Sequence, residues 1–258
     1  MKSIKNIAIA GTGNVATNLA RNLSLNGFNI SGIWSRNFAN AQTLASSCGS
    51  VAYSEIMYLT IKADLIIIAV TDSAIELVAR SIGEYDGIVV HTAGSVNMNI
   101  FQGIFKQYGV LYPLQTMSKE IQVSLSEVPF FLEASSEDTL LELKKATHIL
   151  SSKVYEADSR QRMLMHTAAV FTGNYSNLMY IIGNELIYLS GMQPEVLFPL
   201  IMETSHKAVT GDPLQYQTGP ARRNDSITIE KHIKALASLP EYAELYRLLA
   251  NIIIKKYE

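Results

Sequence analysis

The stretch KNIAIAGTGNVATNLA, residues 5–20, decides the fold of this chain. An apolar run at 7–10 leads into a Gly-x-Gly-x-x-Ala turn at 11–16, and apolar residues then recur every four positions. This order predicts a β-strand, a tight turn and an α-helix. The strand–turn–helix unit is the first repeat of a pattern that continues through the first 120 residues.

Short apolar runs alternate with helically spaced segments up to residue 120, which predicts parallel strands in a doubly wound, mostly parallel α/β sheet of the Rossmann type. One more strand, a helix and an edge strand are predicted at Val128–Glu133, Ser136–Ser151 and Lys153–Glu156. The earlier strands are predicted at Ile7–Ala10, Ile30–Trp34, Leu65–Val70, Ile88–Val90 and Val110–Leu111.

The pattern changes near residue 155, and we expect two domains, 1–155 and 156–258. Apolar residues in a three-to-four rhythm without proline predict one long helix over Ser159–Leu189. More helices should follow, with Ser226 and Ser238 as N-caps. The second domain is therefore expected to be all-helical.

Composition excludes several classes of protein. The 258 residues are 48% hydrophobic, and the net charge of -2 leaves no basic region for a nucleic acid. No apolar run in the first half approaches a membrane span. Cys48 is the only cysteine, which fits a reducing cytoplasm. No spacing of His, Cys and Asp suggests a metal site.

The glycine turn carries the clearest functional signal. Its first glycine permits a tight turn, the second lets a pyrophosphate approach the backbone, and a small third residue lets helix and strand pack closely. The helix N-terminus then offers free N–H groups to phosphates. We expect a dinucleotide site at Gly11, Thr12, Gly13, Asn14, Val15 and Ala16.

The end of the second strand distinguishes NADP from NAD. An NAD site usually has an acid there, but no acid occurs between Asn29 and Ser54. Arginine binds a phosphate through a bidentate fork, so the sequence favours NADP. The 2′-phosphate is expected at Ser35, Arg36 and Asn37, and the rest of the cofactor beside Val70, Thr71 and Thr92.

Taken together, the Gly-x-Gly-x-x-Ala turn, Ser35-Arg36-Asn37 and Ala69-Val70-Thr71-Asp72 resemble NADP oxidoreductases of the 6-phosphogluconate dehydrogenase-like superfamily, which includes pyrroline-5-carboxylate reductases. More closely, the whole chain resembles a bacterial Rossmann-like family with a helical C-terminal domain of unknown function. That resemblance rests on four motifs: His91–Ser95, Tyr112–Thr116, His166–Phe171 with Asn174, and Thr218–Pro220. The resemblance to the superfamily implies hydride transfer and an NADP cofactor.

The chain departs from the sequences of these families at two points, and its catalytic chemistry is therefore open. The family often has histidine where this chain has Tyr112, so a proton donor at this position would be a tyrosine here. No lysine occurs between Lys153 and Lys207, so the catalytic lysine that the resemblance to β-hydroxyacid dehydrogenases implies is missing.

Several polar residues are candidates for the substrate side. His166 and Asn174 share a helix face with Val170 and could protonate and orient a carbonyl, or could be polar residues satisfied at a domain interface. His91 is either a proton donor or a structural histidine at a strand end. Arg160 and Arg162 either bind a carboxylate or form a solvated first turn.

A polar stretch at 212–225 is predicted to be a long loop that covers the site. Arg222 within it is a candidate for an anionic substrate, although Asp225 could neutralise it while capping the next helix. Ser95 and Gln115 are further candidates for substrate contacts.

We therefore expect an NADP-dependent oxidoreductase that reduces a small, anionic carbonyl or imine compound in an interdomain cleft. His166, Asn174 and Tyr112 are the candidate catalytic residues. The alternative is a non-catalytic NADP(H)-binding redox sensor or regulatory protein. The long apolar helix predicts a homodimer formed through the helical domain.

Overall fold

The computed structural model describes residues 3–258, which divide into two compact units, one ending at Asn174 and the other beginning at Tyr175. The predicted domain boundary near residue 155 stays a prediction, and the helical part of the chain begins at α5 (Ser159–Ala169). The first compact unit extends beyond that point and includes α5. Each unit is described separately below.

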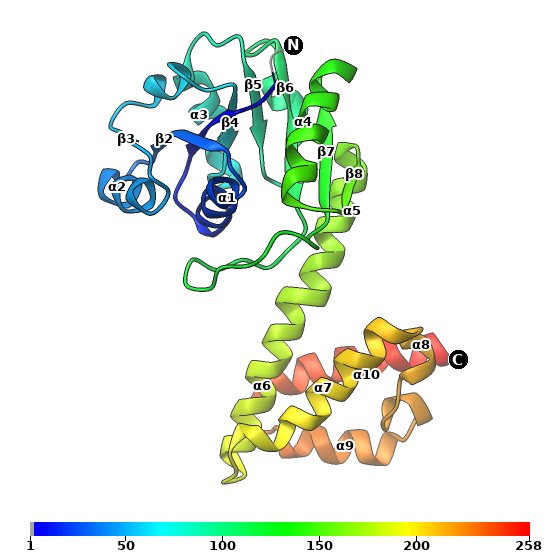
Figure 1. The fold of residues 1–258 in the computed structure, drawn as a ribbon. Coiled ribbons are helices and arrows are strands. Elements are labelled where there is room, and N and C mark those ends of the chain that lie inside the picture. The colour runs from blue at the N-terminus through cyan, green and yellow to red at the C-terminus, as the bar shows by residue number, and fades with distance from the viewer. Residues whose placement is uncertain (1–2) are drawn as a thin grey trace. The chain divides into compact units, whose positions relative to one another are not determined.

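The first unit contains an eight-stranded sheet of order β3-β2-β1-β4-β5-β6-β7-β8 (Figure 1). All neighbouring pairs are parallel except β6 and β7, which confirms the predicted mostly parallel Rossmann sheet. The strands are β1 (Asn6–Ala10), β2 (Asn29–Trp34), β3 (Ala52–Tyr53), β4 (Leu65–Ile68), β5 (Ile88–His91), β6 (Gln107–Pro113), β7 (Phe130–Ala134) and β8 (Val154–Glu156).

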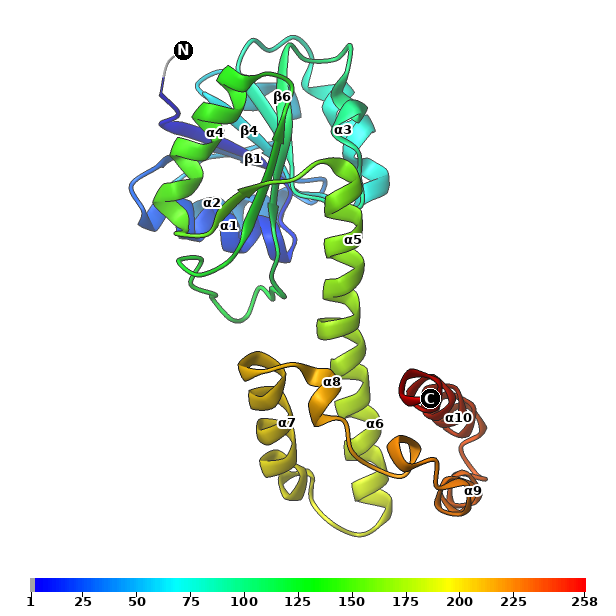
Figure 2. The same ribbon diagram turned by 90° about the vertical axis from the view of Figure 1, so that its right-hand side faces the viewer.

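Both faces of this sheet are buried, as the apolar runs without alternation require. Along β1, Ile7 and Ile9 belong to one core, and Ala8 and Ala10 belong to the other. The first core lies under α1 (Asn14–Leu25), α2 (Phe38–Ser47) and α4 (Glu137–Leu150). The second lies under α3 (Ile75–Ile82) on the opposite face (Figure 2) and under two short 3-10 helices, Ile56–Thr60 and Met98–Phe101. A further 3-10 helix, Asp72–Ala74, leads into α3.

The register of the parallel strands brings their following turns to one edge of the sheet. Ala10 pairs with both Trp34 and Ile68, and Ile68 pairs with His91. The turns after β1, β2, β4 and β5 therefore begin side by side. Ligands of open α/β sheets bind outside these carboxyl ends.

The predicted long helix over Ser159–Leu189 is helical throughout, but it is not a uniform α-helix. Between α5 and α6 (Ser176–Leu189), residues Val170–Tyr175 form a π-helix. A π turn widens the helix locally and often occurs at functional sites. The division of the chain into two compact units falls within this π-helix, between Asn174 and Tyr175.

The second unit is helical, as predicted. After α6 it contains a 3-10 helix at Pro194–Leu197, then α7 (Phe198–Thr210), α8 (Pro213–Tyr216), a 3-10 helix at Ala221–Arg223, α9 (Ser226–Ala235) and α10 (Pro240–Tyr257). None of the helices within residues 3–258 combines the length and the apolar character needed to cross a membrane.

Of the caps that the sequence suggests in the second unit, Asp225 is confirmed, whereas Ser226 and Ser238 are wrong. Asp225 caps α9, because its carboxylate accepts a hydrogen bond from the Thr228 amide at 3.0 Å, and Ser226 is already the first helical residue. α10 begins at Pro240 without a side-chain cap, so Ser238 lies outside it. Proline at the first helical position has no N–H that needs a cap.

The stretch 212–225 is not a loop throughout, because it contains α8 and the 3-10 helix at Ala221–Arg223. Arg222 lies within this second unit, with its guanidinium carbon 4.0 Å from the centre of the Tyr257 ring. The role of Arg222 in binding a substrate stays a prediction.

Candidate active site

The turn between β1 and α1 is held by a close backbone approach at Gly11. Its φ of +128° is a conformation that other residues rarely adopt, and a Cβ atom there would lie 2.1 Å from the Ala69 carbonyl oxygen. The Gly11 amide also donates to the Trp34 carbonyl at 2.7 Å. Ala16 is buried behind the turn. Gly11 and Ala16 therefore allow the backbone of the turn to pack closely against the neighbouring strands.

Gly13 leaves the start of α1 open. It is the N-cap of the helix, yet no side chain caps the first N–H groups. A Cβ atom at Gly13 would meet nothing within 4 Å. An uncapped helix N-terminus beside open space can hold an anionic group, so these residues fit the pyrophosphate of a dinucleotide.

The end of β2 lies next to this turn. The Thr12 hydroxyl donates to the Ser35 Oγ at 3.1 Å, which joins the two predicted cofactor segments. Arg36 is exposed, whereas the Asn37 side-chain oxygen accepts from the Asn40 amide at 3.2 Å and caps α2. Asn37 is thus partly occupied by its capping role, and Arg36 is the cation at this end of the site.

A pocket of about 1760 Å³ runs along this edge of the first unit. It is larger than a pocket for a single drug-sized ligand, so it has room for a dinucleotide and a small substrate. Fourteen of the predicted site residues line it: Thr12, Gly13, Asn14, Val15, Ser35, Arg36, Asn37, Val70, Thr71, Thr92, Tyr112, Gln115, His166 and Asn174. Ser95 is not among the lining residues, and its hydroxyl donates instead to Asp72.

Tyr112 and His166 meet inside this pocket. The Tyr112 hydroxyl lies 3.0 Å from His166 Nδ1, and the two rings cross at 74°. Burial raises the pKa of Tyr112, and the positive charge of Arg162 partly offsets that rise. The phenol is therefore protonated at neutral pH and can act as a proton donor. The sequence proposed each residue separately as a donor, and the structure joins them by a hydrogen bond.

Gly94, which the sequence analysis did not single out, packs closely against the Tyr112–His166 pair. A Cβ atom there would lie 2.8 Å from both the His166 Cβ and the Tyr112 Cζ. The turn after β5 thus closes tightly over the Tyr112–His166 pair. Only its membership of the His91–Ser95 motif drew attention to this glycine.

Asn174 lines the same pocket at the end of the π-helix. His166 and Val170 line it as well, so the predicted shared face of these three residues persists across the change from α-helix to π-helix. Gly173 approaches the loop after β6, where a Cβ atom would contact the Thr116 hydroxyl at 3.4 Å.

The segment 114–129, between β6 and β7, forms one wall of the pocket and is tied to α1 by asparagine side chains. The Asn18 amide nitrogen donates to the Ser118 carbonyl at 2.8 Å, and its side-chain oxygen accepts from the Val123 amide at 3.1 Å. Asn22 donates to the Val123 carbonyl at 3.0 Å. The wall is therefore fixed to the helix that opens at the glycine turn.

His91 fits the structural alternative better than the catalytic one. It is fully buried, and its Nδ1 accepts from the Ala93 amide at 3.2 Å. Burial, followed by the charge of Arg162, lowers the pKa of His91 to about 3. The ring is therefore neutral at physiological pH and is a poor proton source.

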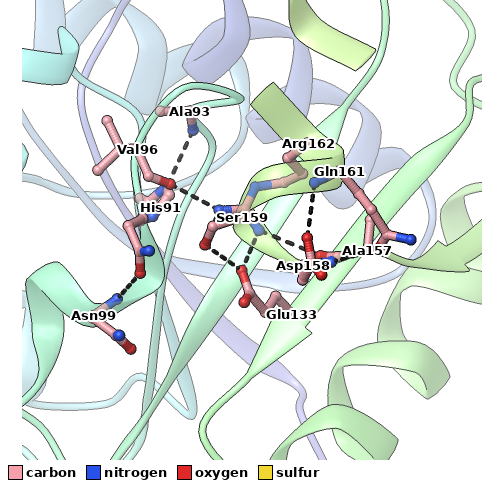
Figure 3. A network of polar contacts seen from close by, with 11 residues as sticks. His91, Ala93, Val96, Asn99, Glu133, Ala157, Asp158, Ser159, Gln161 and Arg162 are labelled. Atoms are coloured by element: carbon pink, nitrogen blue, oxygen red, sulfur yellow. Dashed lines mark hydrogen bonds and ion pairs between the residues drawn. The ribbon is translucent and has the colours of Figure 1, made fainter. Parts of the chain in front are cut away.

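Arg162 has neither of the roles that the sequence suggested. It is 0% exposed and forms an ion pair with Glu133 on β7 (Figure 3). It also donates to the Val96 carbonyl at 2.8 Å and to the Ser159 Oγ at 3.2 Å. A charge buried in this way belongs to the protein's own network, whereas Arg160 is exposed.

Comparisons with known proteins agree with this geometry. The description "NADP oxidoreductase coenzyme F420-dependent" belongs to a family model that matches residues 6–94, and a "Domain of unknown function (DUF2520)" model matches 128–253. A crystal structure from Bacteroides fragilis, described as a "putative NADP oxidoreductase", is 40% identical, with 98% of each chain covered and a TM-score of 0.92. The chain belongs to this NADP oxidoreductase family. NADP, predicted from the residues after β2, is the cofactor of that family.

More distant structures share the fold. A reductive aminase from Aspergillus terreus, solved with NADPH and ethyl-5-oxohexanoate, is 16% identical, with a TM-score of 0.74 over 98% of this chain and 93% of that one. A pyrroline-5-carboxylate reductase from Coxiella burnetii is 17% identical, with a TM-score of 0.58 over 99% and 98%. Comparison with the curated proteins finds no match.

Proposed function

We propose that this family member uses NADPH to reduce a small carbonyl or imine compound, with Tyr112 and His166 supplying the proton. The observation that carries the proposal is the 3.0 Å contact between the Tyr112 hydroxyl and His166 Nδ1 in the pocket that also contains the open N-terminus of α1. A nucleotide site and a proton donor within one pocket are the two parts that such a reduction needs.

For the cofactor, the fit rests on the open helix N-terminus at Gly13 and on the cation beside it. The pyrophosphate would lie against the first N–H groups of α1. Arg36 would hold the 2′-phosphate, with Ser35 and Asn37 beside it, and Val70, Thr71 and Thr92 would contact the remainder. Bound NADPH supplies the hydride in this chemistry.

The protein's own part is to deliver a proton. As the substrate carbon accepts the hydride, the oxygen or nitrogen of the C=O or C=N bond gains an electron pair. The Tyr112 hydroxyl would protonate that atom, and His166 would return its Nδ1 proton to the phenolate as Nε2 takes up a proton from solvent. Asn174 and Gln115, which line the pocket, would orient the substrate by hydrogen bonds.

An anionic substrate is the more specific part of the proposal. The cations among the described pocket residues are Arg36, assigned above to the cofactor, and Lys119. Arg222 of the second unit is the predicted partner of a substrate anion, and Ser95 is a predicted neutral contact. We test this by comparing matched keto acids with neutral ketones.

The deciding experiment measures cofactor binding and turnover together. NADPH and NADH are titrated by fluorescence, and a panel of carbonyl and cyclic imine compounds is then screened for NADPH oxidation. Tyr112→Phe and His166→Ala should lower turnover strongly while NADPH affinity stays close to that of the unchanged chain. Tight NADPH binding without turnover on any compound would instead support the redox-sensor alternative.

We further propose that the chain forms a homodimer through its second unit. No residue of α6 or α7, both of which the structure describes in full, is buried. Large apolar side chains stay exposed there, and helices of this kind need a partner to cover them. A monomeric mass in light scattering at micromolar concentration would contradict the dimer. The exposed apolar side chains on these two helices include Leu178, Leu189, Phe198, Leu200, Met202 and Val209.

We place the protein in the cytoplasm. Support comes from the single cysteine and from a chemistry that depends on a cytoplasmic reductant. Fractionation of cells that produce the chain tests this location.

A further inference from the structure

Arg162 lies one helical turn before His166 on α5. The two residues contact neighbouring strands of the sheet. Arg162 pairs with Glu133 on β7, and His166 reaches Tyr112 on β6. In the antiparallel pairing of β6 with β7, Glu133 lies opposite Val110, which is two residues before Tyr112. Residues two apart on a strand point to the same face, so Glu133 and Tyr112 share one face of the sheet.

The two spacings match. Residues four apart on a helix lie about 6 Å apart, and residues two apart on a strand lie about 7 Å apart. One turn of α5 therefore advances by about the same length as two residues of the strand. Arg162 meets Glu133 at the level of Val110, and His166 meets Tyr112 two residues further along β6. Moving α5 along the sheet would break both contacts together.

We propose that Arg162 is a positioning residue that sets the register of α5 against β6 and β7 and so holds His166 against Tyr112. The inference rests on the proposed function, in which this pair delivers the proton. Arg162 is absent from the residues that line the pocket, so it acts on the reaction only through the pair.

The contacts of Arg162 explain why an arginine is needed. Its guanidinium reaches three separate segments: Glu133 on β7, the Val96 carbonyl after β5, and Ser159 at the start of α5 (Figure 3). Ser159 in turn donates to Glu133 at 3.0 Å. The planar fork of arginine can serve several acceptors at once, whereas lysine provides a single point charge.

The charge of Arg162 also acts on the proton donor. It lowers the pKa of Tyr112 against the rise that burial causes. A cation beside a buried phenol stabilises the phenolate that forms when the proton leaves. Loss of Arg162 should therefore affect both the geometry and the acidity of the pair.

The test observes the pair directly and needs no substrate. Long-range proton–nitrogen NMR spectra of histidine report whether His166 Nδ1 is hydrogen-bonded, and the His166→Gln variant assigns its signals. Tyr112→Phe provides the spectrum of His166 without its partner. Arg162→Met combined with Glu133→Leu removes the ion pair without leaving a lone buried charge. Arg162→Lys is the second variant, and Arg160→Met is the matched control on the exposed side of α5.

We expect both Arg162 variants to shift the His166 signals toward those of Tyr112→Phe. Arg160→Met should match the unchanged chain, and NADPH affinity should be preserved in all of them. Unchanged His166 signals in the folded Arg162 variants would overturn the inference, as would an equal disturbance by Arg160→Met. Full turnover by Tyr112→Phe and His166→Ala would refute the proposed function instead, and would leave the spectroscopic result standing.

Discussion

The two glycines of the β1–α1 turn should respond differently when each is replaced by alanine. Gly11→Ala should lower the stability of the protein, and Gly13→Ala should lower its affinity for NADPH. At Gly11 the new Cβ would lie 2.1 Å from the Ala69 carbonyl oxygen, and φ is +128°. The backbone conformation alone costs about 1–3 kcal/mol for a non-glycine residue. With the displaced carbonyl added, we expect Gly11→Ala to lower the free energy of unfolding by about 3–5 kcal/mol.

Gly13→Ala is the matched comparison. Its φ of -73° and ψ of -176° suit alanine, and its Cβ would meet nothing within 4 Å. Alanine is a poorer N-cap by about 0.5–1 kcal/mol, but it restricts the unfolded chain by about 0.4–1 kcal/mol. The two effects nearly cancel, so stability should hardly change. The new methyl group occupies the space of the pyrophosphate, and NADPH affinity should fall at least about tenfold, equal to about 1.4 kcal/mol.

Urea unfolding and fluorescence titration with NADPH, applied to both variants, measure the two quantities separately. Gly11→Ala with unchanged stability would refute the close approach at Ala69. Gly13→Ala with unchanged NADPH affinity would refute the placement of the pyrophosphate at the α1 N-terminus.

Three further predictions concern other parts of the first unit. Arg36→Ala should weaken NADPH about tenfold and leave NADH nearly unaffected, because only NADPH carries the 2′-phosphate; equal weakening in parallel titrations would reject that assignment. Gly94→Ala should displace the Tyr112–His166 pair and reduce turnover, with NADPH affinity retained; wild-type kinetics would show that the turn has room for a methyl group. The pKa of His91 is about 3 when folded and near 6.5 when unfolded, so the unfolded state binds the extra proton between these values. Stability should therefore fall by about 1.4 kcal/mol per pH unit as pH drops below about 6.5, and His91→Gln should lack this part of the slope in urea unfolding at several pH values.

Local patterns were sufficient to predict most of the first unit. The glycine turn and the apolar runs of β1, β4 and β5 are encoded within a few neighbouring residues. β3 was missed because two residues, Ala52 and Tyr53, are too few to show a pattern. The π-helix was missed because one widened turn leaves the apolar rhythm of the flanking helix intact.

The candidate site shows more clearly which features could not be predicted from the sequence. Tyr112 and His166 were chosen separately, and nothing in either motif indicates that residues 54 positions apart share a hydrogen bond. The burial of Arg162 depends on Glu133, which the sequence analysis named only as the end of a predicted strand. Contacts between distant segments depend on strand register and on the packing of α5, and one sequence gives neither directly.

The asparagine ties between α1 and the segment 114–129 have a consequence for the dynamics of the chain. Asn18 and Asn22 bond this segment at Ser118 and Val123, so it cannot detach without losing bonds to α1. Amide hydrogen exchange in the segment should thus slow to the rate of the helix, and the two should open as one cooperative unit. This wall of the pocket is then ordered before any ligand arrives, and binding need not pay the entropy of arranging it.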